Sequence, residues 1–392
     1  MNTTEQGIIL LLKSAITGEA YPLPEGFQLE EASPIIKKQG IDALCYIGAV
    51  NCGFDKQLLA MKLLFQAYCR QLLQSEGQLA EIQRLYEAFE AQGIDFMPVK
   101  GCNMKLLYPA PELRTMGDAD ILIRMEQYPQ IEQVMQSLDF TFQYESNHEL
   151  VWASKRLMAE LHKRLMPSYN KDYYRYYADG WKLAAQHDGH HYYMTDEDQF
   201  VYIFTHFAKH FRDGGVGSRQ ILDLWVYLRH YPNMDMHYIE NSMKQLQLDE
   251  FYTHILEMLG TWFGGKPASA MSEFITDFVF SGGVWGTAEN HASAKGVRYN
   301  ETALAWVPTH FRPYVRAIFH SPEEMKMQYP ILKKYPILLP FSWPYFWVET
   351  LLFRHDAIRR CVAAAEVTSE ESVERYDELL SYVGLQFRFK QE

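Results

Sequence analysis

The sequence predicts an α+β protein in which a small mixed sheet lies between two helical regions of the chain. Apolar residues recur at three- and four-residue spacing, the period of a helix, in residues 1–92 and again after residue 165. Between them, residues 93–165 hold short runs with the alternating pattern of strands. The 392 residues are enough to bury a large core. We therefore expect an N-terminal helical region (1–92), an α/β core (93–165) and a mostly helical C-terminal region (166–392).

The N-terminal region is predicted to end in a long helix over residues 54–93. Gly93 is expected to end this helix, because glycine readily adopts the left-handed conformation that follows a last helical turn. The apolar residues recur at the spacing of one helical face, and they are Leu58, Met61, Leu64, Phe65, Tyr68, Leu72 and Leu73.

The core is predicted to begin with a strand in IDFMPVKG, residues 94–101, followed by a short helix that stops at Pro109. After a polar turn, DADILIRM is the second strand candidate, and alternation places Asp118 and Asp120 on one of its faces. The run PQIEQVMQSL, residues 129–138, predicts a helix. Three more strands are predicted in FTFQY, HELVWAS and LMAELHKRL, which are residues 140–144, 148–154 and 157–165.

The C-terminal region is predicted to contain helices over residues 196–211, 218–231, 249–263 and 369–385. The cluster of His187, His190 and His191 is predicted to be a polar loop. The run YNKDYYRYY, residues 169–177, has two interpretations: a stacking surface for an acceptor, or tyrosines that pack the helical bundle.

Charge and cysteine content restrict the class of protein. The chain has 37 Lys and Arg residues against 49 Asp and Glu residues, a formal net charge of −12, which argues against a long nucleic acid as partner. The cysteines are scattered and form no CxxC pair, a usage that fits the reducing cytoplasm, and they are Cys45, Cys52, Cys69, Cys102 and Cys361.

The most apolar late stretch is residues 335–353. It contains three prolines and Glu349, so we expect no transmembrane segment there. Its aromatic residues are of the kind enriched at membrane interfaces, which leaves peripheral membrane contact open.

Two aspartates at i and i+2 on one strand face indicate a cation site. The carboxylates of Asp118 and Asp120 can approach within a few ångströms, which is costly unless a cation offsets their repulsion. Glu160 on a neighbouring strand offers a third carboxylate, and His162 follows on the same face. Taken alone, a D-x-D pair is also typical of a solvated strand end.

Upstream, Lys100 and Gly101 lie where a strand meets a helix N-terminus, a position at which backbone N–H groups can receive phosphate. A glycine also closes many strands that bind nothing. In combination with the carboxylates, however, this turn indicates a site for a metal-bound nucleoside triphosphate.

The run VKGCNMKLLYPAPELRTMGDADILI, residues 99–123, resembles the nucleotidyltransferase superfamily with the polymerase-beta-type core, and most closely its uncharacterised bacterial branch. Residues 159–165, 204–211 and 218–228 also resemble that branch. The resemblance implies that Asp118 and Asp120 bind metal, that Glu160 is the third carboxylate and that Gly101 marks the phosphate-side turn. One departure is that Lys100-Gly101-Cys102 replaces the Gly-Ser or Gly-Gly pair of better characterised relatives.

The chemistry that this resemblance implies is transfer of an NMP group from an NTP to a hydroxyl, with release of pyrophosphate. Two Mg²⁺ ions, or Mn²⁺ in their place, would be held by the three carboxylates, and Glu160 could double as general base. Arg114 could offset charge on the leaving phosphates, because a guanidinium makes bidentate contacts with phosphate oxygens. The acceptor is expected to be a small molecule or a protein.

Histidines and a lysine near the predicted core are further candidates for nucleotide contact. His162, Lys209 and His210 are expected to touch the nucleotide, although His162 could instead orient Glu160. His206 and His210 lie at i and i+4 on a helix, but the glutamate of an HExxH metal motif is missing. Asp213, Arg219 and Asp223 are predicted to cap or bridge helices.

Two other functions stay open from the sequence. One is a catalytically silent protein that binds a nucleotide or a partner, in which case the carboxylates should hold no metal. The other is a tRNA-type nucleotidyltransferase, which would associate with RNA in a salt-sensitive way.

Overall fold

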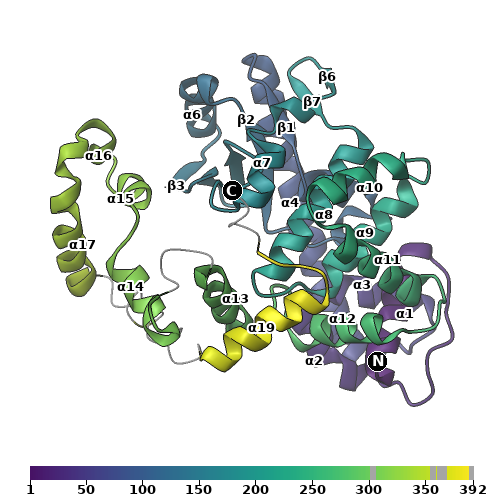
Figure 1. Ribbon diagram of the computed structural model, residues 1–392. Helices are drawn as coiled ribbons and strands as arrows, with labels where there is room; N and C mark the ends of the chain where they lie inside the picture. Colours follow the sequence, from purple (N-terminus) through teal and green to yellow (C-terminus); the bar gives the residue numbers. More distant parts are fainter. Residues whose placement is uncertain (301–305, 354–358, 360–368, 388–392) are drawn as a thin grey trace.

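The computed structural model describes residues 1–300, 306–353, 359 and 369–387, so Cys361 lies outside the described residues. One seven-stranded mixed sheet is surrounded by helices from both ends of the chain (Figure 1), as the α+β prediction requires. The helical N-terminal and C-terminal regions are both present.

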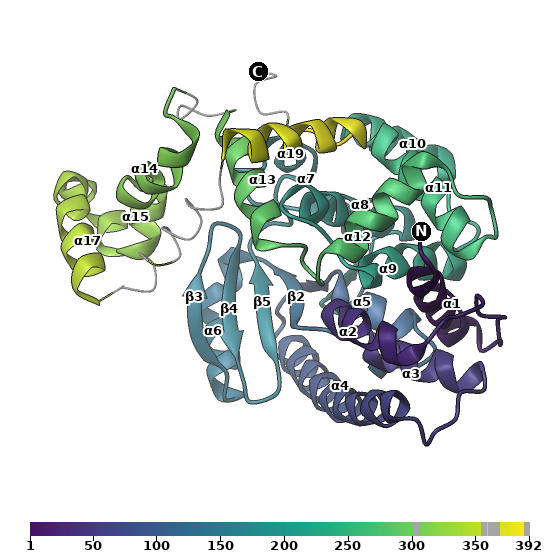
Figure 2. The same cartoon turned by 90° about the horizontal axis from the view of Figure 1, so that it is seen from below.

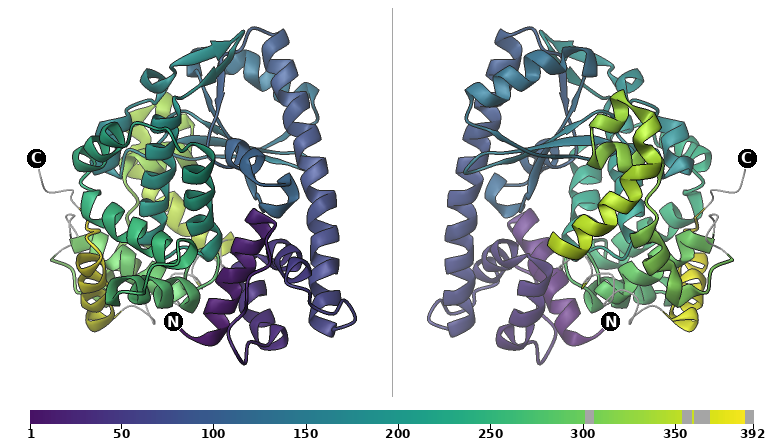
Figure 3. Two further views of the ribbon diagram at one scale, coloured as in Figure 1. Left: turned by 90° about the vertical axis from the view of Figure 1, so that its right-hand side faces the viewer. Right: turned by 90° about the vertical axis from the view of Figure 1, so that its left-hand side faces the viewer.

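The N-terminal helices are α1 (Thr3–Thr17), α2 (Leu29–Gln39), α3 (Asp42–Asn51) and α4 (Leu59–Ala91). The predicted start of the long helix at residue 54 was wrong, because a turn precedes Leu59. Helix α4 packs on α3 at one end and on the sheet at the other, and Figure 3 shows it running along both. Several residues of its predicted apolar face are therefore exposed, among them Phe65 and Leu73.

The sheet has the order β3-β4-β5-β2-β1-β7-β6. Strands β2 and β5 are parallel, and β1 pairs antiparallel with β2. The strands are β1 (Phe96–Pro98), β2 (Asp118–Ile123), β3 (Thr141–Glu145), β4 (Glu149–Ala153), β5 (Met158–His162), β6 (Gln186–Asp188) and β7 (His191–Tyr193).

The hairpin β6–β7 corrects one prediction. His187, His190 and His191 do not form a polar loop, because β7 pairs with β1 and extends the sheet beyond residue 165. The backbone N–H of Phe96 donates to the carbonyl of His190 at 3.0 Å, and the His191 ring stacks on the Phe96 ring at 4.6 Å. A tertiary contact therefore gives strand structure to a short polar run.

The two faces of β2 pack against different cores. Ala119, Ile121 and Ile123 are buried in a cluster with residues of α4 and of α6 (Tyr128–Ser137). Leu122 faces the opposite side, where it joins the core of the helical body. Alternation along a single strand therefore directs Asp118 and Asp120 toward the helices that follow the sheet.

The body that faces Asp118 and Asp120 is built mainly from α8 and α9, whose buried faces carry Phe and Leu residues at helical spacing. Tyr173 and Tyr177 are buried in the same core, which favours bundle packing over a stacking surface for the tyrosine run. The helices are α5 (Gly101–Met104), α7 (Lys171–Tyr177), α8 (Asp196–Arg212), α9 (Ser218–His230), α10 (Met236–Gln245), α11 (Asp249–Phe263), α12 (Ala270–Ser281), α13 (Ala288–Asn300) and α19 (Glu370–Tyr382).

A separate group of helices lies beside the β3 edge of the sheet (Figure 2), where Lys333 pairs with Glu145 at 3.2 Å. This group has its own small core and many exposed aromatic and aliphatic side chains. No helix in the described part of the chain is both long enough and apolar enough to cross a membrane. The group consists of α14 (Arg312–Ile318), α15 (Pro322–Gln328), α16 (Ile331–Lys334) and α17 (Leu339–Phe353).

Candidate active site

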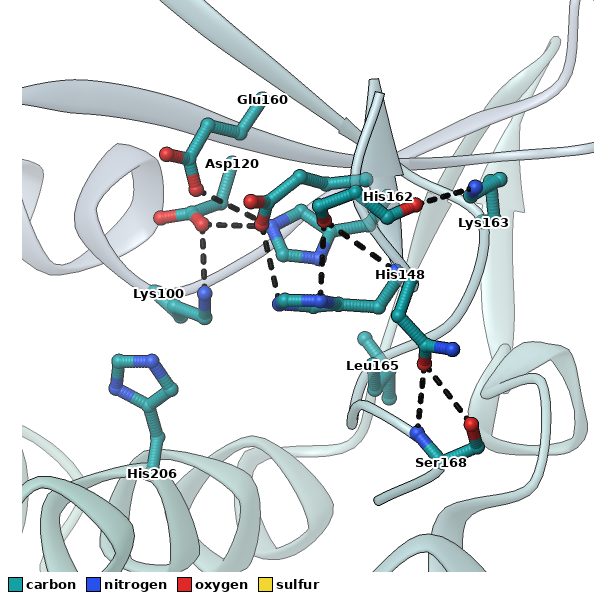
Figure 4. Close-up of polar contacts among 12 residues, drawn as sticks. Lys100, Asp120, His148, Glu160, His162, Lys163, Leu165, Ser168 and His206 are labelled. Carbon is teal, nitrogen blue, oxygen red and sulfur yellow. Dashed lines mark hydrogen bonds and ion pairs between the residues drawn. The ribbon is translucent and has the colours of Figure 1, made fainter. Parts of the chain in front are cut away.

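Three carboxylates meet on one face of the sheet because of the register between β2 and β5. Asp120 lies directly opposite Glu160 on the parallel neighbour, and Asp118 lies opposite Met158 one step earlier. The next pair on this face brings His162 opposite Leu122. Figure 4 shows the side chains of Asp120, Glu160 and His162 converging. The pairing thus joins residues that are forty positions apart in the sequence.

Asp120 is the best-paired of the three carboxylates. Its Oδ1 atom accepts hydrogen bonds from Lys100 Nζ at 2.6 Å and from His162 Nε2 at 2.8 Å. Burial alone would raise the pKa of Asp120, but the charge of Lys100 and the hydrogen bond from His162 outweigh it, so the pKa lies below its usual value. Asp120 is therefore ionised, and His162 carries its proton on Nε2.

The other two carboxylates lack such compensation. Burial, together with the neighbouring charges of Asp118 and Asp120, raises the pKa of Glu160 from 4.5 to about 9. Burial and the charge of Asp120 also raise the pKa of Asp118. At neutral pH and without a cation, Glu160 holds a proton that it can donate to Asp118. Glu160 keeps this proton because no positive charge offsets all three carboxylates.

Two of the three carboxylates, together with His162, form a donor set that fits a divalent cation. Ligand atoms of Asp120, Glu160 and His162 lie within 4.8 Å of one another, and carboxylate oxygens are the ligands that Mg²⁺ and Mn²⁺ prefer. A second group with the same spacing consists of His148, Glu149 and His162. No sequence pattern points to His148, because its place depends on the β4–β5 pairing.

Lys100 owes its position to a strained turn between β1 and α5. Its backbone has φ 49° and ψ −115°, a conformation that residues with a side chain rarely adopt. Such strain costs of the order of 1–3 kcal/mol and is concentrated at functional sites. A side chain at Gly101 would lie 3.2 Å from Arg114 Nη1, so glycine permits a close approach of the arginine there.

Arg114 points its guanidinium at Asp223 of α9. Its Nε donates to Oδ1 at 2.8 Å and its Nη2 donates to Oδ2 at 3.0 Å, a bidentate and buried ion pair. The Tyr108 hydroxyl donates to the same carboxylate at 2.7 Å. This arrangement confirms that Asp223 bridges elements, and it engages two of the five N–H groups of Arg114.

A cavity of about 120 Å³ opens between Asp118 and Asp120 of β2 and the helices α8 and α9. Glu160 and His162 lie beside Asp120 but outside its lining, and Lys209 does not line it either. The polar and aromatic side chains that line it are Lys100, Arg114, Thr115, Asp118, Asp120, His206, Phe207, His210, Arg219, Gln220, Asp223 and Trp285.

The chain matches a known protein family. A family described as uncharacterised nucleotidyltransferase matches residues 25–264, more than half of the chain. The chain belongs to this nucleotidyltransferase family. No curated protein and no solved structure matches it. Family membership makes an NTP the substrate, and the matched range contains all three carboxylates and nearly the whole lining of the cavity.

Two residues that line the cavity of this nucleotidyltransferase were not predicted from the sequence to do so. Trp285 lies in the loop before α13, beyond the matched range, and its half-exposed ring contacts His210 at 4.9 Å between centroids. Arg219, predicted to cap or bridge helices, lines the cavity instead of pairing closely with a helix. An isolated tryptophan and an i,i+4 Arg–Asp pair carry no special pattern, so the sequence offered no signal for either.

His206 and His210 form a pair across the cavity from the carboxylates. Their Nε2 atoms are 3.1 Å apart, so one donates to the other. Burial and the nearby positive charges hold the pKa of each histidine well below its usual value, with Lys100 foremost for His206 and Lys209 for His210. Both rings are therefore neutral, which suits contact with a base or sugar better than contact with phosphate.

Proposed function

We propose that this enzyme transfers an NMP group from an NTP to a hydroxyl of a small molecule or a protein, with Mg²⁺ held by Asp118, Asp120 and Glu160. The observation that carries the proposal is the convergence of three carboxylates, two with raised pKa values, beside a cavity that Asp118 and Asp120 line together with Arg114 and Arg219. A metal–triphosphate complex would bring a cation to the carboxylates and phosphate anions to the arginines.

The bound metal would supply charge neutralisation at the triphosphate and a lower pKa for the acceptor hydroxyl. The acceptor oxygen forms a bond to the α-phosphorus, the bond to the β-phosphate oxygen breaks, and pyrophosphate leaves. Glu160, ionised once the cation offsets its neighbours, accepts the hydroxyl proton. With a cation held by Asp120, the Lys100 ammonium, whose Nζ lies 2.6 Å from Asp120 Oδ1, would be available to donate to a phosphate oxygen.

We also propose a cytoplasmic location for the protein. The four cysteines within the described ranges are free thiols, as a reducing compartment maintains them. The formal net charge of −12 favours a small-molecule or protein acceptor over a long nucleic acid.

Labelled nucleotides test the proposal. The full chain is incubated with each α-labelled NTP, Mg²⁺ and a cell extract, and the label is followed into acceptors. We expect transfer by the wild type and by Glu257→Gln, an exposed change on α11, and none by Asp118→Asn. Nucleotide-dependent thermal stabilisation without transfer in any extract would instead support a catalytically silent binder. Binding of tRNA at low salt would favour the tRNA-type alternative.

A further inference from the structure

Buried positive charge gathers beside the cavity. Arg114 and Arg219 line it, and Lys105, which lies outside the lining, donates to the Arg114 carbonyl at 3.0 Å. All three are at least nine-tenths buried. The anions beside them are Asp223, Glu112 and, for Arg219, Asp118, and Glu112 also accepts a hydrogen bond from Tyr68 at 3.0 Å. In a region of low dielectric constant, an incompletely paired charge is expensive.

Among the described residues that line the cavity, Arg219 is the arginine with the more distant ion-pair partner. Asp223 already receives two short hydrogen bonds from Arg114 and one from Tyr108, and its contact with Arg219 Nη1 is longer, at 3.6 Å. Arg219 Nε has no hydrogen-bond partner among the described residues, although the residue is only 8% exposed. A buried guanidinium with an unused donor is a binding group without its ligand.

The electrostatics of the neighbours agree with this geometry. Burial, and next the charge of Arg114, lower the pKa of Arg219. Burial and the charge of Arg114 likewise lower the pKa of Lys105 from 10.5 to about 8. Each of these cations would be stabilised by an added anion, and Arg219 alone both lines the cavity and has an unused donor.

We propose that Arg219 binds the polyphosphate of the substrate, and that the Arg114–Asp223 pair is a positioning device that holds it there. This assignment rests on the proposed function and gives the phosphate contact to Arg219 in place of Arg114. A guanidinium suits phosphate because its planar N–H groups match two oxygens at once. Asp118 on the facing wall would repel a lone anion, whereas a polyphosphate can carry its own cation.

Inorganic tripolyphosphate tests the assignment without catalysis or acceptor. Its affinity for the full chain is measured by calorimetry, in EDTA and again with Mg²⁺, with Arg219→Gln, Arg219→Lys and the matched control Arg229→Gln, an exposed arginine of the same helix outside the cavity. We expect at least tenfold weaker binding by Arg219→Gln, partial retention by Arg219→Lys and no change in Arg229→Gln. Thermal melting confirms that each variant is folded.

The outcomes separate this inference from the proposed function. Unchanged affinity in a folded Arg219→Gln variant, or no binding of tripolyphosphate by the wild type with or without Mg²⁺, would overturn the role of Arg219. Tripolyphosphate binding that depends on Arg219 in a protein that transfers no label supports the role of Arg219 while contradicting the activity. A second arm repeats the EDTA titration with Asp118→Asn, where we expect equal or tighter binding because one repelling carboxylate is gone.

Discussion

The two walls of the cavity have opposite charge and are built in different ways. The acidic wall comes from two neighbouring strands, where alternation and parallel register align Asp118, Asp120 and Glu160. The basic wall comes from distant segments, where Arg114 reaches across to Asp223 on α9 beside Arg219. The acidic wall is therefore set by local strand geometry and the basic wall by long-range packing.

Both walls nevertheless have the same electrostatic defect. Burial together with like charges raises the pKa of Glu160 beside one wall and lowers the pKa of Lys105 beside the other. A cation would offset the charge beside the first wall and an anion the charge beside the second. One metal–triphosphate complex would supply both.

Removal of one carboxylate should have the largest effect on activity and little effect on stability. Asp118→Asn is expected to reduce NMP transfer about a thousandfold, since loss of a metal ligand costs several kcal/mol in the transition state. The melting temperature in EDTA should stay equal or rise, because repulsion from Asp120 disappears. Label transfer and thermal melting measure the two effects. If Asp118→Asn lost both its activity and its fold, the acidic wall would be needed for stability, contrary to this prediction.

The basic wall should respond in the opposite way, with a large effect on stability. Asp223→Asn leaves Arg114 and Arg219 without their shared carboxylate, and we expect the free energy of unfolding to fall by about 3–5 kcal/mol. Urea denaturation measures the change. The control Glu289→Gln breaks an exposed pair with Arg375 and should cost no more than about 1 kcal/mol. Equal losses of unfolding free energy in both variants would contradict the structural role of the buried Arg114–Asp223 pair.

The acidic wall predicts a stability that falls as pH rises. The pKa of Glu160 is 4.5 in the unfolded chain and about 9 in the folded, metal-free protein. Between these values the folded state binds the additional proton, so its stability declines with increasing pH. Melting temperatures in EDTA across this range should show a weaker decline for Glu160→Gln than for the wild type. An identical slope would mean that Glu160 is not strained.

The basic wall predicts a smaller effect of opposite sign. The pKa of Lys105 falls from 10.5 in the unfolded chain to about 8 in the folded protein. In that window the unfolded state binds more protons, so the lysine's unfavourable contribution fades as pH rises. The wild type should therefore gain stability relative to Lys105→Met between pH 8 and 10.5, as measured by paired melts. A constant difference would show that Lys105 already has sufficient compensation.

The sequence predicted much of the fold and the acidic half of the site. Hydrophobic periodicity located the main helices, and the α+β class was confirmed. It missed the hairpin β6–β7, because residues 186–193 are polar and become strands only by pairing beside β1. It also gave no sign that the Arg114 guanidinium pairs with Asp223, 109 positions away, because such a pair depends on tertiary packing.

The sequence by itself determined which residues share a strand face, since the two-residue period of a strand is a local property. It therefore placed Asp118 beside Asp120 and put Glu160 and His162 on one face of a later strand. Only the tertiary structure decided which charges are neutralised. Lys100 meets Asp120, Arg114 meets Asp223 closely and Arg219 meets the same carboxylate only at 3.6 Å, because those pairings depend on how distant elements pack.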